Sequence, residues 1–177
     1  MEPNSDEMLS FIKSRKSVRS FIYEKIDNDT IKEIIECGRW APSGSNSQPW
    51  KVCVVIHPTV KRMLSELSKY GGIIESAYVN FVVFLDLEKG YDRVKDLQAM
   101  GAFIQNILLA VHAKGLGAVW IGEILSKKNE VDEIFKLSVD KFELMGVIAV
   151  GVIDEPMASQ KAKERERYPL DDFIEFY

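Results

Sequence analysis

The stretch RVKDLQAMGAFIQNILLAVHAK, residues 93–114, decides the fold of this chain. Its spacing is helical, yet its apolar side chains cover almost the whole circumference of the helix instead of one face. A helix of this kind is covered on all sides, either by its own domain or by another subunit. The stretch therefore predicts a domain built around one long central helix.

Shorter patterned segments on both sides of this helix predict the remaining elements. Apolar runs predict strands at residues 50–56, 79–87, 118–122 and 142–152. Amphipathic spacing predicts helices near residues 8–14, 30–40, 58–70 and 127–137. Gly71 and Gly72 are expected to end the third of these helices. Helices interleaved with strands predict a layered α/β or α+β domain.

The composition of the chain indicates its number of domains, its expected partners and its cellular location. A chain of 177 residues, 46% of them hydrophobic, predicts one domain over residues 1–177. The net charge of -4 gives no general positive field, so neither nucleic acid nor a membrane surface is expected as a partner. The polar, acidic start favours a cytoplasmic protein. Cys37 and Cys53 are too few and too far apart for a disulfide framework or a zinc pattern, and both are expected to be buried.

A basic segment, residues 15–19, reads Arg-Lys-Ser-Val-Arg and follows the first predicted helix. Two or three cations and a hydroxyl at a helix-to-loop junction can bind one phosphate group. A short basic run is equally suited to a solvated surface, which is its more common role. Charge alone leaves both interpretations open.

A polar loop, APSGSNSQPW at residues 41–50, carries more hydrogen-bonding groups than a helix-to-strand connection needs. Its two prolines fix the ends of the loop, as suits a ligand-binding segment. Serine, glycine and asparagine are also the usual residues of an ordinary turn. The loop by itself therefore does not decide between the two roles.

Other chemical signatures are sparse. Arg165 and Arg167 alternate near the C-terminus and would point the same way in an extended segment, or belong to a mixed-charge surface. His57 and His112 stand alone, and no HxxxH, GxSxG, Walker or paired-carboxylate pattern occurs. Hydrolytic chemistry loses its support, and no metal site is expected.

Taken together, these segments resemble the FMN-dependent nitroreductase family. The family pattern Arg-Arg-Ser-Val-Arg-x-Phe corresponds to residues 15–21, and Ala-Pro-Ser-x-x-Asn-x-Gln-Pro-Trp corresponds to residues 41–50. GAFIQN at residues 101–106 and GLGAVWIG at residues 115–122 continue the likeness in the family's order. The resemblance implies an α+β nitroreductase-type fold, with a mainly antiparallel central sheet flanked by helices.

The resemblance also implies a set of FMN-binding residues. Arg15 and Ser17, helped by Lys16, would bind the phosphate and ribityl chain, while Arg19 would lie near N1 and the C2 carbonyl of the ring. A cation near N1 would stabilise the reduced flavin. A loop from the other subunit would line the flavin with Pro42, Ser43, Gly44 and Asn46. Near flavin N5 would lie Trp120, Ile121 and the backbone N–H of Gly122. A basic pair at the phosphate would be Arg165 and Arg167.

The implied protein is an intertwined homodimer in which residues 155–177 pack on the partner subunit. Its implied reaction passes hydride from NAD(P)H through FMN to an acceptor such as a nitroaromatic or a quinone, in ping-pong order. No catalytic side chain is then required, because flavin N5 carries the chemistry. Larger bacterial members have asparagine and lysine near Tyr70–Ile73, and a long insertion that is missing here, so any substrate lid must come from residues 88–97.

Several alternatives stay open on the sequence alone. Within the family they are flavin reduction, reductive dehalogenation and oxidation of another substrate. Outside the enzyme class they are an FMN-binding or sensing protein without nicotinamide turnover, and a protein that binds no flavin.

Overall fold

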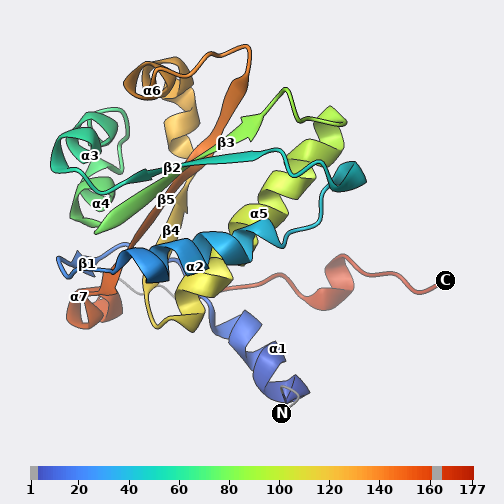
Figure 1. Cartoon of the computed structure of the whole chain (residues 1–177). Coiled ribbons are helices and arrows are strands. Elements are labelled where there is room, and N and C mark those ends of the chain that lie inside the picture. Colours follow the sequence, from blue (N-terminus) through green and yellow to red (C-terminus); the bar gives the residue numbers. More distant parts are fainter. Residues whose placement is uncertain (1–3, 161–164) are drawn as a thin grey trace.

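The computed structural model describes residues 4–160 and 165–177, and its described part contains a five-stranded antiparallel sheet (Figure 1). The long strand β5 (Phe142–Ile153) lies at its centre. One edge of β5 pairs with β3 (Val79–Asp86), which in turn pairs with the edge strand β2 (Trp50–Val55). Its other edge pairs with β4 (Gly117–Ile121) and with the two-residue β1 (Phe21–Ile22).

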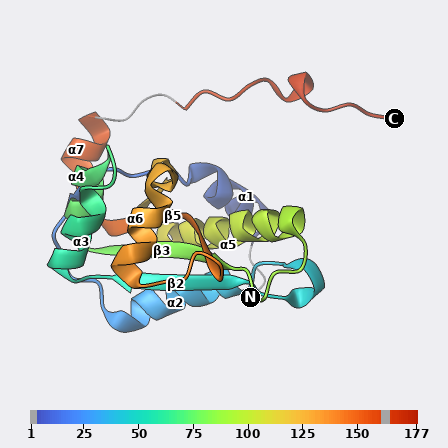
Figure 2. The ribbon, with the colours of Figure 1, turned by 90° about the horizontal axis from the view of Figure 1, so that it is seen from above.

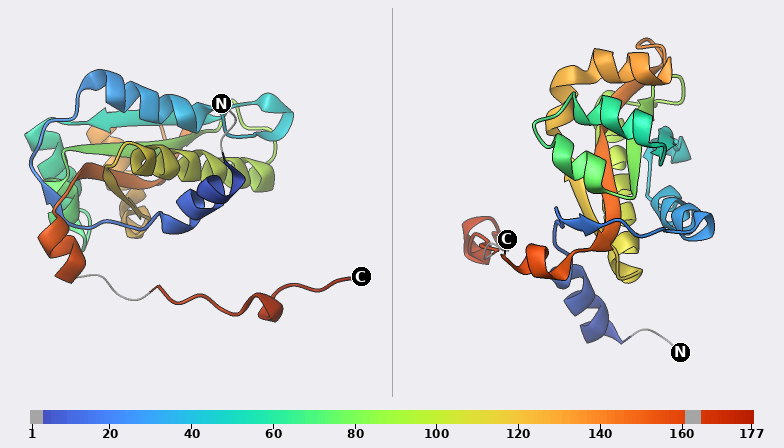
Figure 3. Two further views of the ribbon diagram at one scale, coloured as in Figure 1. Left: turned by 90° about the horizontal axis from the view of Figure 1, so that it is seen from below. Right: turned by 90° about the vertical axis from the view of Figure 1, so that its left-hand side faces the viewer.

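Helices cover both faces of the sheet (Figure 3). The long helix predicted from the sequence is α5 (Arg93–Ala113), which packs with α2 (Asn28–Arg39) on one face. On the opposite face lie α3 (Pro58–Ser65), α4 (Gly71–Ser76) and α6 (Lys128–Phe135). The remaining helical segments are α1 (Ser5–Ser14), η1 (Gly44–Asn46), η2 (Glu123–Lys127), α7 (Glu155–Gln160) and η3 (Leu170–Asp172).

Strand β3 shows why the sheet needs helices on both sides. All eight of its residues are buried. Phe81 and Val83 pack in the core with α2 and α5, whereas Val82 and Phe84 pack in the core with α3, α4 and α6. Successive side chains of a strand point to opposite faces, so an uninterrupted apolar run requires two covered faces.

One predicted helix boundary was wrong, and one strand was not predicted. Gly71 and Gly72 do not end the helix that begins at Pro58: that helix stops at Ser65, and the glycine pair begins α4. A Cβ on Gly71 would lie 2.2 Å from the carbonyl oxygen of Ser65, so glycine is needed where the chain turns back. Strand β1 was not predicted, because two residues are too short to show alternation.

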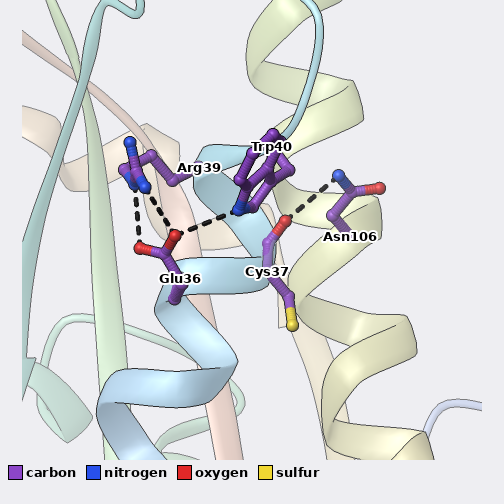
Figure 4. Close-up of polar contacts among 5 residues, drawn as sticks. All are labelled: Glu36, Cys37, Arg39, Trp40 and Asn106. Atoms are coloured by element: carbon purple, nitrogen blue, oxygen red, sulfur yellow. Dashed lines mark hydrogen bonds and ion pairs between the residues drawn. The ribbon is translucent and has the colours of Figure 1, made fainter.

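The C-terminal end of α2 is clamped beside α5 by polar contacts (Figure 4). Arg39 forms an ion pair with Glu36 at 2.6 Å, and the indole N–H of Trp40 donates to the same carboxylate at 3.0 Å. Across the helix pair, the side-chain amide of Asn106 donates to the carbonyl of Cys37 at 3.2 Å. The polar loop after α2 therefore starts from a fixed position.

The two cysteines are less buried than predicted. The thiol-bearing residue Cys37 is exposed on α2, and Cys53 is half-buried because it lies on the edge strand β2. Both are free cysteines.

The C-terminal segment contains two short helical elements. Residues 155–160 form α7 and residues 170–172 form η3, while residues 161–164 lie outside the described part. Figure 2 shows residues 165–177 running past the domain, set apart from the sheet and the helices that cover it. Its exposed large apolar side chains are Tyr168, Leu170, Phe173, Phe176 and Tyr177.

Candidate flavin site

The basic segment, residues 15–19, lies across the beginning of β4. The backbone N–H of Val18 donates to the carbonyl of Ala118 at 2.9 Å, and the Val18 side chain is buried. This approach depends on Gly117, since a Cβ there would lie 2.7 Å from Cγ1 of Val18. Ser17 and Arg19, on either side of the buried valine, are exposed. The backbone thus fixes where the flanking polar side chains emerge.

A first cavity of about 190 Å³ adjoins the start of the basic segment. Arg15 and Lys16 line it together with His112 from the last turn of α5. Glu155, the first residue of α7, contributes a carboxylate to the same wall. The remainder of the lining is apolar: Val18, Leu108, Leu116, Ala118 and Ile153.

The C-terminal segment adds more positive charge at this cavity. The guanidinium of Arg165 donates to the carbonyl of Arg15 at 2.5 Å and to that of Lys13 at 3.1 Å. Burial lowers the pKa of Arg15, and repulsion by Arg165 and Arg167 lowers this pKa further. Within residues 4–160 and 165–177, no carboxylate forms an ion pair with any of these three arginines. Converging guanidinium groups without a counter-ion are the arrangement expected of a site for a phosphate group.

A second cavity, of about 470 Å³, lies at the other end of the basic segment. Arg19 lines it beside Lys69 and Tyr70, which come from the loop before α4. The ammonium group of Lys69 lies 5.3 Å from the centre of the Tyr70 ring. This loop therefore brings a second cation to the cavity that Arg19 lines.

Gly122 follows β4 and lies next to the same loop. Its neighbour Glu123 accepts a hydrogen bond from the hydroxyl of Ser68 at 2.7 Å, which ties the end of β4 to residues 66–70. Gly122 is exposed, and a Cβ on it would meet no protein atom within 4 Å. The space beside its backbone is therefore open to a ligand.

Trp120 and Ile121 were predicted to line one region, but their side chains lie on opposite faces of the sheet. Ile121 is buried in the core formed with α3, α4 and α6. Trp120 is exposed on the α5 face, where it lines a cavity with Met100 and Ile104. Adjacent strand residues cannot both present side chains to one ligand, so Ile121 has only its backbone to offer there.

The polar loop that contains Pro42, Ser43, Gly44 and Asn46 lies elsewhere on the chain. Its backbone is held in the left-handed region at Ser45, Asn46 and Gln48, where φ is 52°, 55° and 50°. The hydroxyl of Ser43 accepts a hydrogen bond from the backbone N–H of Gln48 at 3.0 Å. Left-handed conformations at residues other than glycine cluster at functional sites.

This loop and the basic segment lie at opposite ends of α5. A Cβ on Gly44 would meet the ring of Tyr91 at 2.7 Å and Cβ of Lys95 at 3.6 Å, so the loop packs on the beginning of the helix. Arg15, in contrast, shares its cavity with His112, near the end of the helix. At about 1.5 Å per residue, Lys95 and His112 are about 25 Å apart along the helix axis. A single chain does not bring the two predicted halves of the site together.

Comparisons with known proteins fit this arrangement. The sequence profile of the nitroreductase family matches residues 12–78 and 62–152. The chain belongs to the nitroreductase family. A protein of Bacillus subtilis named as a candidate NAD(P)H nitroreductase is 31% identical to it over 178 residues, which is 89% of this chain and 90% of that protein.

Solved structures of the family have the same fold. A candidate nitroreductase from Desulfovibrio desulfuricans, crystallised in complex with FMN, matches this chain with a TM-score of 0.88 and 34% identity, over 98% of this chain and 96% of that one. By sequence, an NADPH-dependent oxidoreductase of Staphylococcus haemolyticus is also similar, at 25% identity over 94% of this chain and 72% of its own length. The predicted family and nitroreductase-type fold are confirmed.

Two residues of this nitroreductase-family chain were not predicted as part of the site. Lys69 lines the cavity of Arg19 and comes just before the region, Tyr70–Ile73, where larger members of the family have asparagine and lysine. His112 lines the cavity of Arg15, although it stands alone in the sequence. Both are brought in by contacts between distant segments, which no local motif encodes.

Within the described residues, no helix has both the length and the apolar character that crossing a membrane requires.

Proposed function

We propose that this nitroreductase-family protein is an FMN-dependent oxidoreductase that takes electrons from NAD(P)H and passes them to an acceptor such as a nitroaromatic or a quinone. One observation carries the proposal: Arg15, Arg165 and Arg167 converge without an ion-paired carboxylate in the described part of the chain. An anionic ligand would relieve their mutual repulsion. The phosphate of FMN is such a ligand, and the relatives support the choice.

Residues that line or lie near the two cavities match the two ends of FMN. At the phosphate end, Arg15, Arg165 and Arg167 supply charge, with Ser17 and Lys16 beside them. At the ring end, Arg19 supplies the cation and Gly122 leaves open space beside its backbone. When bound, FMN supplies the reversible two-electron chemistry. The chain itself binds the ligand, orients it and places positive charge where the reduced ring is anionic.

The functional unit in this proposal is a homodimer. Pro42, Ser43, Gly44 and Asn46 lie about 25 Å from His112 and the first cavity along α5, so they can reach a flavin only in another copy of the chain. Exposed apolar residues on α1 and on the C-terminal segment offer surface for that copy: Met8, Leu9, Ile12, Leu170 and Phe173. Residues 155–177 would then pack on the partner, and Trp120 and Ile121 would flank Gly122. The free thiols of Cys37 and Cys53 suit a reducing, cytoplasmic location.

Rapid mixing with a nicotinamide tests the proposed reaction. The purified protein, loaded with FMN and kept free of oxygen, should lose the absorbance of oxidised flavin within seconds of mixing with NADH or NADPH. A quinone or nitroaromatic added afterwards should restore it. Persistent yellow colour with both nicotinamides would favour a flavin-binding protein without this turnover, and a preparation that takes up no FMN would contradict the proposal.

A matched pair of variants tests the site. Arg15→Ala should lose most of its FMN on gel filtration, because it removes the guanidinium at the first cavity. Lys13→Ala removes an equal charge two residues away, on the exposed last turn of α1, and should retain FMN. Equal flavin content in the two variants would place the phosphate elsewhere.

A further inference from the structure

His112 is held firmly at the wall of the first cavity. Its Nε2 lies 2.7 Å from the hydroxyl oxygen of Ser14, the last residue of α1. Its ring stacks on Phe11, with centres 4.9 Å apart and planes inclined by 26°. The imidazole thus connects the end of α1 to the last turn of α5, immediately before the residues that supply cations to the cavity.

The contacts of Ser14 are compatible with a protonated ring. The hydroxyl of Ser14 lies 2.8 Å from the carbonyl oxygen of Phe11, to which it can donate its single hydrogen, and 2.7 Å from Nε2 of His112. In a protonated ring Nε2 donates to the Ser14 oxygen, which in turn donates to Phe11. Nδ1 has no hydrogen-bond partner among the residues described. The neutral ring can therefore take up a proton without breaking the contact with Ser14.

The charges around the ring are mostly positive. The loop after α1 supplies the cations Arg15 and Lys16, and the C-terminal segment supplies Arg165. Helix α7 supplies one carboxylate, that of Glu155. From α1 it contacts the neutral side chains of Phe11 and Ser14. Burial, and then repulsion by Arg15, Arg165 and Lys16, lower the pKa of His112 below its usual value. With no anion bound among these cations, the surroundings of the ring therefore favour its neutral form.

We propose that His112 takes up a proton from solvent when a phosphate group binds beside Arg15 and Lys16, and that the protonated ring is a further binding residue for this phosphate. The inference rests on the proposed FMN site. A phosphate carries about two negative charges near neutral pH, which offset the repulsion that keeps the ring neutral. Binding and protonation then favour each other, as linkage requires.

Calorimetry of FMN binding to flavin-free protein tests this coupling. His112→Gln keeps a side-chain N–H that can reach Ser14 but cannot titrate. The wild type should take up more protons for each FMN bound at pH 7 than His112→Gln does, measured in buffers of different ionisation enthalpy. The ratio of the two FMN affinities should rise about tenfold in favour of the wild type between pH 8 and pH 6. The phosphate of FMN titrates in the same range, but this contribution is common to both proteins.

His57 supplies the control, because it is the other of the two histidines and caps α3 away from the cavity. His57→Asn should behave as the wild type does. Because the chain has two histidines, the imidazole NMR signal that disappears in His57→Asn belongs to His57 and the other belongs to His112. The pKa of His112 followed by this signal should be higher with FMN bound than without it. If the wild type and His112→Gln take up equal numbers of protons on binding FMN, and the pKa of His112 is the same with and without FMN, the inference is overturned while the proposed function stands. Failure of the wild type to bind FMN would overturn the proposed function, and the inference with it.

Discussion

At the scale of single residues, the basic segment separates into two parts with different environments. Arg15 faces a small cavity with other arginines nearby, whereas Arg19 faces a larger one with Lys69 and Tyr70. Val18 lies between these two arginines, and the hydrogen bond from its backbone N–H to the carbonyl of Ala118 fixes its position. A phosphate at one end and a ring at the other is the division of roles that this geometry favours.

Arg19→Ala should change the redox behaviour of the bound flavin more than its retention. Loss of the cation destabilises the anionic reduced ring, so the two-electron potential should fall by about 30 mV, equivalent to about 1.4 kcal/mol. Equilibration with reference dyes under anaerobic conditions measures this potential. Lys51→Ala, on the exposed edge strand β2, should leave it unchanged. An equal potential in all three proteins would remove Arg19 from the ring end.

Asp132 is a buried carboxylate outside the site. It is 4% exposed on α6, and its Oδ1 has no hydrogen-bond partner in the described part of the chain. Burial raises the pKa of this carboxyl. A raised folded-state pKa gives stability that is complete below the unfolded pKa and is lost as pH rises through the folded value.

Asp132→Asn should therefore raise the free energy of unfolding at pH 7 by about 1 kcal/mol, because the amide carries no charge to bury. The gain should shrink towards pH 3, where the wild-type carboxyl is protonated in both states. Urea unfolding at the two pH values checks this. A gain of equal size at both would show that ionisation of Asp132 is not its source.

At the scale of helices and strands, the sequence predicts best where many side chains of one segment agree. Helix α5 and strand β3 were predicted correctly because each contains a long run of mostly apolar residues that fits only one type of element. Elements β1 and α4 were missed because two and six residues carry too little periodicity. In the candidate site, Arg15 and Arg19 were predicted from a local motif, whereas the positions of His112 and Lys69 depend on contacts between distant segments.

The crossing of the basic segment over β4 depends on a missing side chain. Gly117→Ala would place a Cβ 2.7 Å from Cγ1 of Val18, and this overlap should cost about 1–3 kcal/mol of stability and weaken FMN binding. Adding Val18→Gly removes both Cγ1 and Cβ of Val18, which the new Cβ would approach to 2.7 and 2.8 Å, and should restore FMN affinity relative to Gly117→Ala alone. Thermal unfolding and fluorescence titration measure the two effects. No recovery in the double variant would mean that Gly117 acts otherwise than through Val18.

At the scale of the whole molecule, the two predicted halves of the site lie at opposite ends of α5. A site completed by a second copy would make FMN binding depend on dimer formation, and FMN would stabilise the dimer in turn. The exposed aromatic residues of the C-terminal segment would be covered in the same assembly.

Mixed dimers distinguish a shared site from a site within one chain. Arg15→Ala and the double variant Ser43→Ala/Asn46→Ala should each bind FMN poorly. When they are unfolded together and refolded, each mixed dimer should contain one site with all wild-type residues, and FMN binding should return at those sites. The same variants refolded separately and then combined without exchange are the control. If binding never returns on mixing, the loop and the arginine belong to one chain's site.

Arg165 and Arg167 follow every strand of the sheet in chain order. The sheet and the helices that cover it are therefore built entirely from residues that precede both arginines. We accordingly expect the domain to fold and remain intact without its ligand. Loading with flavin becomes a late step, so a shortage of the vitamin would leave folded, refillable protein instead of degraded chains.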